Sequence, residues 1–228
     1  MSDPLAGSPW SAPATVQGFV QSPPNATLID FARRELVRAA QGRALDIGCG
    51  AARNALPLAD LGWDVLGVDL SRPMVEAARA RAAAGARHQG RLDVVLAAMD
   101  ALPAGSGRFD LIVAQGIWNL ARSSVEFRAG VREAARVAAR GAALFVFTFS
   151  RRTLPADAQP LAGEAFVFTQ FSGQPQCFLT REQLVDQLGR VGFEPDHGVP
   201  WVEHNAPPHG TAHVLRAPVI HEAAFRVR

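Results

Sequence analysis

An acidic residue followed by a glycine-rich turn is the part of the sequence best suited to chemistry. Asp46 ends a short apolar run, and Gly48 and Gly50 follow it. Glycines at these positions let the backbone turn sharply and bring bare N–H groups close to a ligand. A second apolar run ends in Asp69, whose carboxylate can bind both hydroxyls of a ribose. A strand, a glycine turn and a helix open a nucleotide-binding βαβ unit, so the pattern predicts a ligand that contains a nucleoside.

Arg53 helps to decide which nucleotide this is. The dinucleotide fingerprint has Gly or Ala at the sixth position counted from Gly48, where this chain has Arg53. The long side chain argues against NAD or FAD. The sequence also contains neither Tyr nor Lys, so it cannot supply the Ser/Tyr/Lys set of an NAD-dependent oxidoreductase. An NAD-dependent Rossmann oxidoreductase is therefore the less favoured alternative.

Two motifs resemble those of a known family. Residues 45–50, Leu-Asp-Ile-Gly-Cys-Gly, resemble the first motif of the class I S-adenosylmethionine (SAM)-dependent methyltransferases, and residues 68–71, Val-Asp-Leu-Ser, resemble the second. The pair Arg53-Asn54 is similar to the branch that includes tellurite-resistance methyltransferases. This resemblance, over residues 28–195, implies SAM as the cofactor. It also implies an α/β, Rossmann-like fold with a seven-stranded, mostly parallel sheet, helices on both faces and a final antiparallel strand.

The resemblance further implies roles for single residues. Asp46 would receive the ammonium group of the methionine part, partly through water, and Asp69 would bind the ribose. Asp100 would accept a hydrogen bond from the adenine amino group. Cys49 is better explained as a small packed side chain within the turn. Leucine and methionine side chains would add apolar walls, and backbone groups beside Asp100 would frame the adenine. In full, the expected cofactor-binding residues are Asp46, Gly48, Cys49, Gly50, Arg53, Asn54, Asp69, Leu70, Met74, Met99, Asp100, Ala101 and Gln115.

The segment after the fourth expected strand, residues 115–119, bears on the methyl acceptor. It lacks the Asn-Pro-Pro-aromatic motif of DNA amino methyltransferases. The chain also lacks a Pro-Cys motif, which would supply the nucleophile for methylation of a pyrimidine carbon. Both absences favour a small-molecule acceptor. Methyl transfer from a sulfonium needs alignment and exclusion of water, so no catalytic triad is required and no catalytic residue is assigned. Trp118 fits equally well as a core residue or as a substrate wall. The expected substrate contacts are Trp10, Phe19, Trp118, Asn119 and His204.

Three histidines, His204, His209 and His213, lie close together late in the chain. The last two have the i, i+4 spacing of a metal-binding pair, but that spacing works only on a helix. Pro207 and Pro208 favour a loop instead, so no metal site is expected. A histidine that accepts a proton from the substrate stays open as an alternative to a solvated loop.

The chain divides into a short N-terminal segment and one domain. Residues 1–24 are rich in Pro, Ser, Gly and Ala, yet they include Trp10 and Phe19, which are costly to leave in water. We expect a lid over the cofactor, with a flexible tail as the alternative. Residues 25–228 form a single domain with an inserted strand or hairpin at 164–178. We also expect a helix from Asn25 that ends at Gly42, and another from Ser123 to Arg140 that precedes a strand at 142–149.

Composition excludes several classes of partner. The net charge is +2 and the arginines are scattered, so no basic run suggests a nucleic-acid surface. No signal peptide and no membrane-spanning apolar run are visible, and two cysteines make no disulfide framework. We therefore expect a cytoplasmic protein with a small-molecule substrate. The sequence leaves open the oligomeric state, the methylated atom and a non-catalytic SAM-binding or scaffold role.

Overall fold

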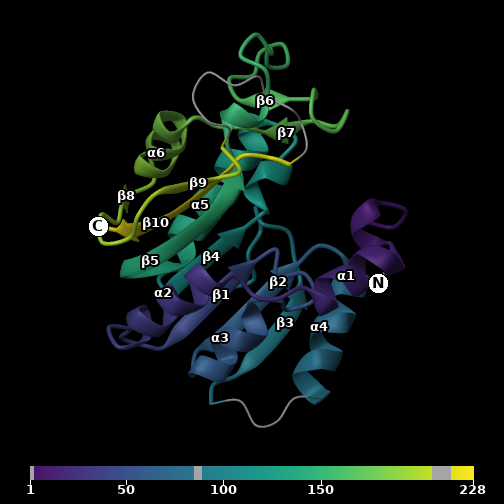
Figure 1. Cartoon of the computed structure of the whole chain (residues 1–228). Helices are drawn as coiled ribbons and strands as arrows, with labels where there is room; N and C mark the ends of the chain where they lie inside the picture. Colours follow the sequence, from purple (N-terminus) through teal and green to yellow (C-terminus); the bar gives the residue numbers. More distant parts are fainter. Residues whose placement is uncertain (1–2, 85–88, 207–216) are drawn as a thin grey trace.

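A mostly parallel β-sheet forms the centre of the molecule (Figure 1). The computed structural model describes residues 3–84, 89–206 and 217–228. In the described part the sheet has eight strands, seven of them in the continuous order β3-β2-β1-β4-β5-β10-β8, while β9 pairs with β10. The strands are β1 (Arg43–Ile47), β2 (Asp64–Asp69), β3 (Leu92–Leu96), β4 (Phe109–Gln115), β5 (Ala138–Phe149), β8 (Phe193–Pro195), β9 (Val202–His204) and β10 (Ile220–Val227).

The expected final antiparallel strand is confirmed. Strands β1 to β5 run parallel to one another, and β10 runs antiparallel between β5 and β8. The seven-stranded sheet of the expectation corresponds to the continuous path, and β9 is an additional strand beside it.

Helices cover both faces of the sheet, as expected. On one face α2, α3 and α4 pack against Val113 and Phe145, and on the other α5 and α6 pack against Ile112 and Leu144. Adjacent β4 residues thus contribute to opposite cores, as in strands buried on both faces. These helices are α2 (Ala26–Leu36), α3 (Ala55–Leu61), α4 (Arg72–Ala84), α5 (Ser124–Val137) and α6 (Arg181–Gly189).

Side-chain caps explain where several helices begin. The Asn25 side chain accepts a hydrogen bond from Leu28 N at the start of α2, at 3.1 Å. Thr180 and Gln183 form a reciprocal capping box at the start of α6. Each cap satisfies backbone N–H groups that have no partner within the helix, so the polar residues fix these starting points.

Two expected helix ends are wrong. Helix α2 ends at Leu36, before Gly42, and the following Val37 is 88% exposed. Helix α5 ends at Val137, before Arg140, because Ala138 is extended and begins β5. The N–H of Arg108, the residue just before β4, donates to the Val137 carbonyl at 2.7 Å, so a residue far from the helix in sequence bonds to its last carbonyl.

The N-terminal segment and an inserted hairpin flank this core. The segment contains the 3-10 helix η1 (Pro9–Ser11) and α1 (Pro13–Gln21), which lies against α4. Within residues 164–178, β6 (Val167–Phe168) and β7 (Gln176–Cys177) form an antiparallel hairpin. It contacts η2 (Trp118–Leu120), and η3 (Arg151–Thr153) follows β5. None of the described helices is long and apolar enough to cross a membrane.

Candidate functional site

The turn after β1 requires glycine at two positions. Gly48 and Gly50 have φ of 72° and 54°, in the left-handed region. A Cβ on Gly48 would lie 2.9 Å from the Ile117 side chain, and one on Gly50 would lie 2.8 Å from the ring of Phe19. Ala52, with φ of 59°, adopts the same region without being glycine, which the sequence alone did not predict. The turn is therefore tightly covered by both the loop after β4 and the N-terminal segment.

Asp69 fixes the geometry between β2 and this turn. One carboxylate oxygen accepts from Gly50 N at 2.8 Å, and the other accepts from Ser71 N at 2.8 Å. Burial raises the pKa of Asp69, and these N–H groups partly oppose that rise. A carboxylate oxygen can accept more than one hydrogen bond, so Asp69 keeps acceptor capacity for ligand hydroxyls.

Asp46 is the acid whose environment most needs a ligand. It is 2% exposed, and its buried Oδ2 atom has no hydrogen-bond partner among the described residues. Burial raises its pKa to about 7, although the positive charge of Arg53 acts in the opposite direction. The Arg53 guanidinium lies 5.7 Å from the centre of the Phe19 ring. Buried acceptors without partners are rare in folded proteins, so a cationic ligand group fits beside Asp46.

Asn54 and Gln115 form a polar bridge across the same edge. Asn54 Nδ2 donates to Gln115 Oε1 at 2.9 Å, and Asn54 Oδ1 accepts from Asn25 N at 3.0 Å. The bridge ties the starts of α2 and α3 to the end of β4. Both expected cofactor residues thus have protein partners already, and their first role in the structure is to hold these elements together.

The adenine side is more open. Asp100 and Ala101 are exposed after β3, while the Met99 side chain points toward Gly130 of α5. Leu70 is half-buried beside Asp69, whereas Met74 is 2% exposed and packs within the core. Cys49 is also buried, with its Sγ 2.9 Å from a Cβ built on Gly67. The structure therefore brings Asp46 and Asp69 to one turn but leaves Asp100 in contact with solvent.

Two of the expected substrate contacts are buried instead. Trp118 is fully buried against Phe127, with ring centres 6.1 Å apart, so it packs as a core residue in this structure. Asn119 is 2% exposed, so it too is not available as an open contact. Both lie in η2 beneath the inserted hairpin, which the local sequence could not reveal.

The remaining substrate candidates lie on two sides of the carboxyl edge. Trp10 and Phe19 pack edge to face at 6.4 Å over the glycine turn. His204 lies on β9, with its ring 5.9 Å from that of Phe147. His209 and His213 lie outside the described residues. No group of His, Cys, Asp and Glu able to hold a metal is found in the described part of the chain.

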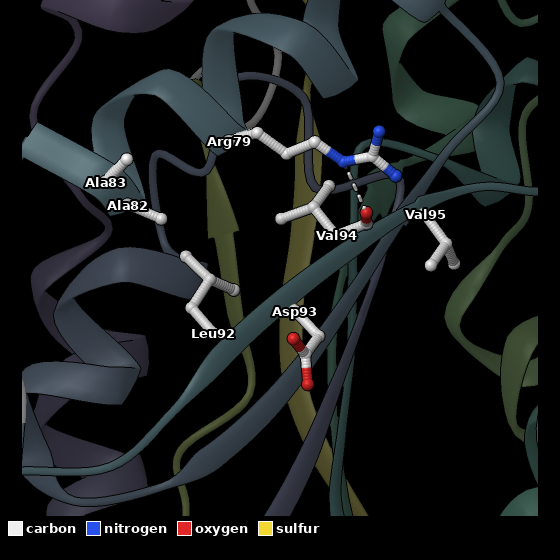
Figure 2. A pocket seen from close by; sticks show the side chains of 7 residues that line it. All are labelled: Arg79, Ala82, Ala83, Leu92, Asp93, Val94 and Val95. Carbon is white, nitrogen blue, oxygen red and sulfur yellow. Dashed lines mark hydrogen bonds between the residues drawn. The ribbon is translucent and has the colours of Figure 1, made fainter.

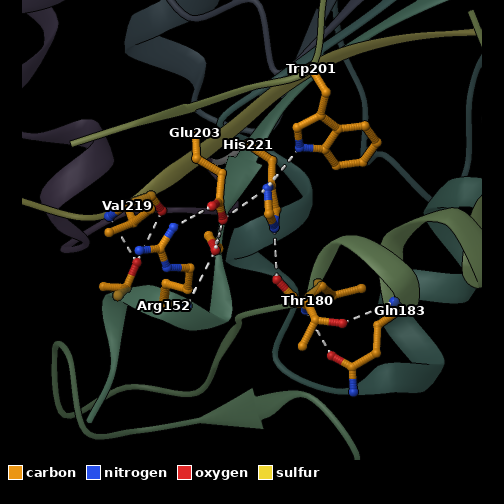
Figure 3. Close-up of polar contacts among 10 residues, drawn as sticks. Arg152, Thr180, Gln183, Trp201, Glu203, Val219 and His221 are labelled. Carbon is orange, nitrogen blue, oxygen red and sulfur yellow. Dashed lines mark hydrogen bonds and ion pairs between the residues drawn. The ribbon is translucent and has the colours of Figure 1, made fainter. Parts of the chain in front are cut away.

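A buried histidine that the sequence did not single out joins the C-terminal strands (Figure 3). His221 Nδ1 accepts from Trp201 Nε1 at 3.2 Å, so its Nε2 donates to the Leu179 carbonyl at 3.0 Å. Burial lowers the pKa of His221. Glu203 accepts from Ser150 at 2.7 Å and lies 3.4 Å from His221. This group is a structural junction between β9, β10 and the residues before α6.

The pocket at the edge strand β3 is separate from this site (Figure 2). Arg79 of α4 donates to the Val94 carbonyl at 2.9 Å there, covering part of the strand edge. Its lining contains none of the expected site residues; it consists of Arg79, Ala82, Ala83, Leu92, Asp93, Val94 and Val95.

Comparison with known proteins agrees with the geometry. Residues 44–141 match the family model of a methyltransferase domain. The structure is similar to the CcbJ methyltransferase from Streptomyces caelestis, with 19% identity, TM-score 0.66, and coverage of 93% of this chain and 95% of that one.

Two further solved structures share the fold. One is 1,6-didemethyltoxoflavin-N1-methyltransferase from Burkholderia thailandensis, with 16% identity, TM-score 0.63, and coverage of 89% of this chain and 78% of that one. The other is the [4+2]-cyclase SpnF, with 21% identity, TM-score 0.64, and coverage of 88% and 80%. The likeness to the tellurite-resistance branch stays a prediction. The chain thus matches a methyltransferase domain over residues 44–141 and shares the fold of the SAM-dependent methyltransferases to which it is similar.

Proposed function

We propose that the protein transfers the methyl group of SAM to a small-molecule acceptor by direct in-line displacement. The observation that carries the proposal is the buried, unpartnered Oδ2 of Asp46 beside the positive charge of Arg53. The amino acid end of SAM carries an ammonium and a carboxylate, and this pair of side chains offers one opposite charge to each. Bound SAM supplies a methyl group on a sulfonium, a strong electrophile that needs no activation by a base.

The residues of the chain would bind and orient the cofactor. Asp46 would accept from the ammonium, Arg53 would pair with the carboxylate, and Asp69 would accept from the ribose hydroxyls. The N–H groups of Gly48 and Cys49 already donate to the Val68 carbonyl, at 2.8 and 3.0 Å. The glycines would therefore serve mainly to let the backbone come close to the cofactor, because the N–H groups of Gly48 and Cys49 are already used within the protein.

The small size of the acceptor is supported by charge and by one structural neighbour. The scattered arginines and a net charge of +2 do not build a surface for a polyanion. The neighbour from Burkholderia thailandensis was solved with bound 1,6-didemethyltoxoflavin and S-adenosylhomocysteine. The cyclase among the neighbours shows that this fold also serves other reactions, so the test must measure methyl transfer itself.

Two measurements test the proposal. S-adenosylhomocysteine should raise the melting temperature, since it would bind the native state, and NAD should not. The protein should then convert SAM to S-adenosylhomocysteine in the presence of at least one member of a panel of phenols, amines, thiols and metalloid oxyanions. A shift with NAD alone would refute the cofactor assignment. Binding without turnover on the whole panel would favour the non-catalytic SAM-binding alternative.

A further inference from the structure

A second polar group lies at the carboxyl edge of the sheet, and the cofactor roles above do not use it. Glu222 of β10 is 4% exposed, and its Oε2 accepts from Asn25 Nδ2 at 2.8 Å. Its Oε1 lies 3.3 Å from Nε2 of His204 on β9. Burying a carboxylate is costly unless it is paired, so a buried glutamate with a half-exposed histidine as its neighbour calls for an explanation.

The strand register places this pair beside the cofactor residues. Gln115, Phe147 and Glu222 are direct neighbours across β4, β5 and β10, so their side chains point to the same face. Strands are spaced about 4.8 Å apart, which puts the backbones of Gln115 and Glu222 about 10 Å apart. Asn25 contacts both Glu222 and Asn54, and Asn54 contacts Gln115. The pair therefore lies on the same face and at the same edge of the sheet as Gln115, next to the proposed cofactor site.

One aromatic ring lies against the histidine, and two more continue from it toward the inserted hairpin, where they also pack on Phe178. Phe147 and Phe149 lie two residues apart on β5, so their side chains are on the same face, and both are half-buried. The His204 ring lies 5.9 Å from Phe147, and Phe171, between β6 and β7, lies 5.5 Å from Phe149. Half-buried rings on three elements offer flat apolar contacts to a planar molecule.

We propose that Phe147, Phe149, Phe171, His204 and Glu222 form an acceptor site for a planar aromatic compound with an ionisable hydroxyl group. This inference rests on the proposed methyl transfer. The hydroxyl proton passes to His204, and an oxygen lone pair forms the new bond to the methyl carbon. The carbon–sulfur bond breaks, its electron pair stays on sulfur, and S-adenosylhomocysteine leaves. His204 then releases the proton to solvent.

Glu222 acts as a positioning residue for His204. With Nε2 turned toward the glutamate, Nδ1 is the ring nitrogen left to accept a proton. Nε2 and Oε1 are close but not aligned as a hydrogen bond, and such contacts commonly tighten when substrate binds. Glu203 and His221 precede His204 and Glu222 in their strands, so they point to the opposite face, toward Ser150 and Trp201 (Figure 3).

The experiment uses 4-nitrophenol, whose phenolate absorbs at a different wavelength from the neutral phenol. With S-adenosylhomocysteine at saturation, the wild-type protein should bind 4-nitrophenol saturably and raise its ionised fraction above that in buffer. His204→Gln should still bind S-adenosylhomocysteine, but the bound phenol should ionise about tenfold less readily. Glu222→Gln should act in the same direction, and the exposed control His197→Gln should match the wild type.

Shape and aromaticity are tested separately. Phe171→Ala should weaken 4-nitrophenol binding about tenfold, because it removes a ring from the site. Cyclohexanol, which is neither planar nor acidic, should not compete at the concentrations at which 4-nitrophenol saturates.

The outcomes separate this inference from the proposed function. If S-adenosylhomocysteine binds but 4-nitrophenol does not, or if the bound phenol ionises equally in His204→Gln, the acceptor site is wrong while the methyltransferase proposal stands. Unchanged 4-nitrophenol binding in Phe171→Ala would remove the aromatic site. If S-adenosylhomocysteine itself fails to bind, both proposals fall.

Discussion

At the scale of single residues, Asp46 is buried and Asp69 is half-buried, and they differ in the hydrogen bonds that their carboxylates accept. Both acids lie at the carboxyl ends of parallel strands and have raised pKa values caused mainly by desolvation. Asp69 is stabilised by N–H donors on both oxygens, whereas Oδ2 of Asp46 has none. We infer that Asp69 builds the turn as well as binding ribose, while Asp46 is held ready for a cation.

Replacing Asp69 with Ala should weaken SAM binding. The ribose hydroxyls would lose an acceptor in a partly buried site, at a cost of about 1–3 kcal/mol. That corresponds to about 5- to 150-fold in affinity. Isothermal titration calorimetry on the folded variant, with Asp93→Ala on the outer strand as control, measures the change. Equal affinity in both variants would remove Asp69 from the site.

Replacing Asp46 with Asn should separate stability from function. The raised pKa means that the folded protein keeps a proton on Asp46 that the unfolded chain releases between pH 3.8 and about 7. The contribution of Asp46 to stability is therefore present at low pH and lost as the pH rises through about 7. At about pH 8, urea unfolding of Asp46→Asn without ligand should show a gain on the order of 1–3 kcal/mol.

The same Asp46→Asn variant should bind SAM about tenfold or more weakly, because the amide cannot neutralise the ammonium. Calorimetry gives this value on the sample used for unfolding. A variant that is both less stable at about pH 8 and unchanged in SAM affinity would contradict the assigned role.

The residues of the turn could be predicted because their signal is local. Asp46, Gly48, Gly50 and Asp69 lie within one strand-turn-helix-strand unit, where spacing alone brings them together. Glu222 could not be found this way, because it meets Asn25 from 197 positions away. The burial of Trp118 likewise depends on Phe127 and the hairpin, which its own neighbours in sequence do not specify.

At the scale of elements, the N-terminal segment forms a cover over the glycine turn. The Trp10 carbonyl accepts from Ser71 Oγ at 3.3 Å, and Phe19 lies against Gly50. The segment has no fully buried residue in η1 or α1, so few apolar contacts hold it in place. Such an element can open at low cost, which suits a lid.

Deleting residues 1–22 should lower the melting temperature by only a few degrees, because the segment adds little to the main core. SAM affinity and turnover should fall sharply. Limited proteolysis of the full chain should show slower cleavage at residues 10–22 once S-adenosylhomocysteine is added. Equal cleavage with and without ligand, together with normal SAM binding by the truncated protein, would mean that the segment is a flexible tail.

Element starts were easier to predict than element ends. Asn25 and Thr180 cap helices through bonds to residues three positions on, which the sequence shows directly. The end of α5 depends on Arg108, the residue just before β4, whose N–H donates to the Val137 carbonyl. The sequence around Gly141 therefore does not show that the helix ends earlier, at Val137.

At the scale of the whole molecule, His221 should make stability depend on pH. Its folded pKa is lowered, so the unfolded chain binds the proton more readily. Its contribution to stability is complete above about pH 6.5 and is lost as the pH falls through the lower, folded pKa. Urea unfolding at about pH 5.5 and about pH 8 should show a smaller loss on acidification in His221→Gln than in the wild type.

The exposed His197→Gln variant serves as the control for His221 and should keep the wild-type dependence on pH. Asp46 and Asp69 have raised pKa values, so their contributions to stability change with pH in the opposite direction. The test therefore compares the pH dependence of stability between variants and does not rely on the wild type alone. Identical pH dependence in wild type and His221→Gln would exclude the histidine as the titrating group.

The position of β10 has a consequence for the order in which the chain can fold during synthesis. Residues 220–227 lie between β5 and β8, so the sheet cannot close while the ribosome is still adding them. The emerging chain can form the β1–β5 half early, yet its β5 edge stays open to other chains until the last strand arrives. A stalled ribosome would therefore leave a nascent chain with its methyltransferase motifs in place and an aggregation-prone edge beside them.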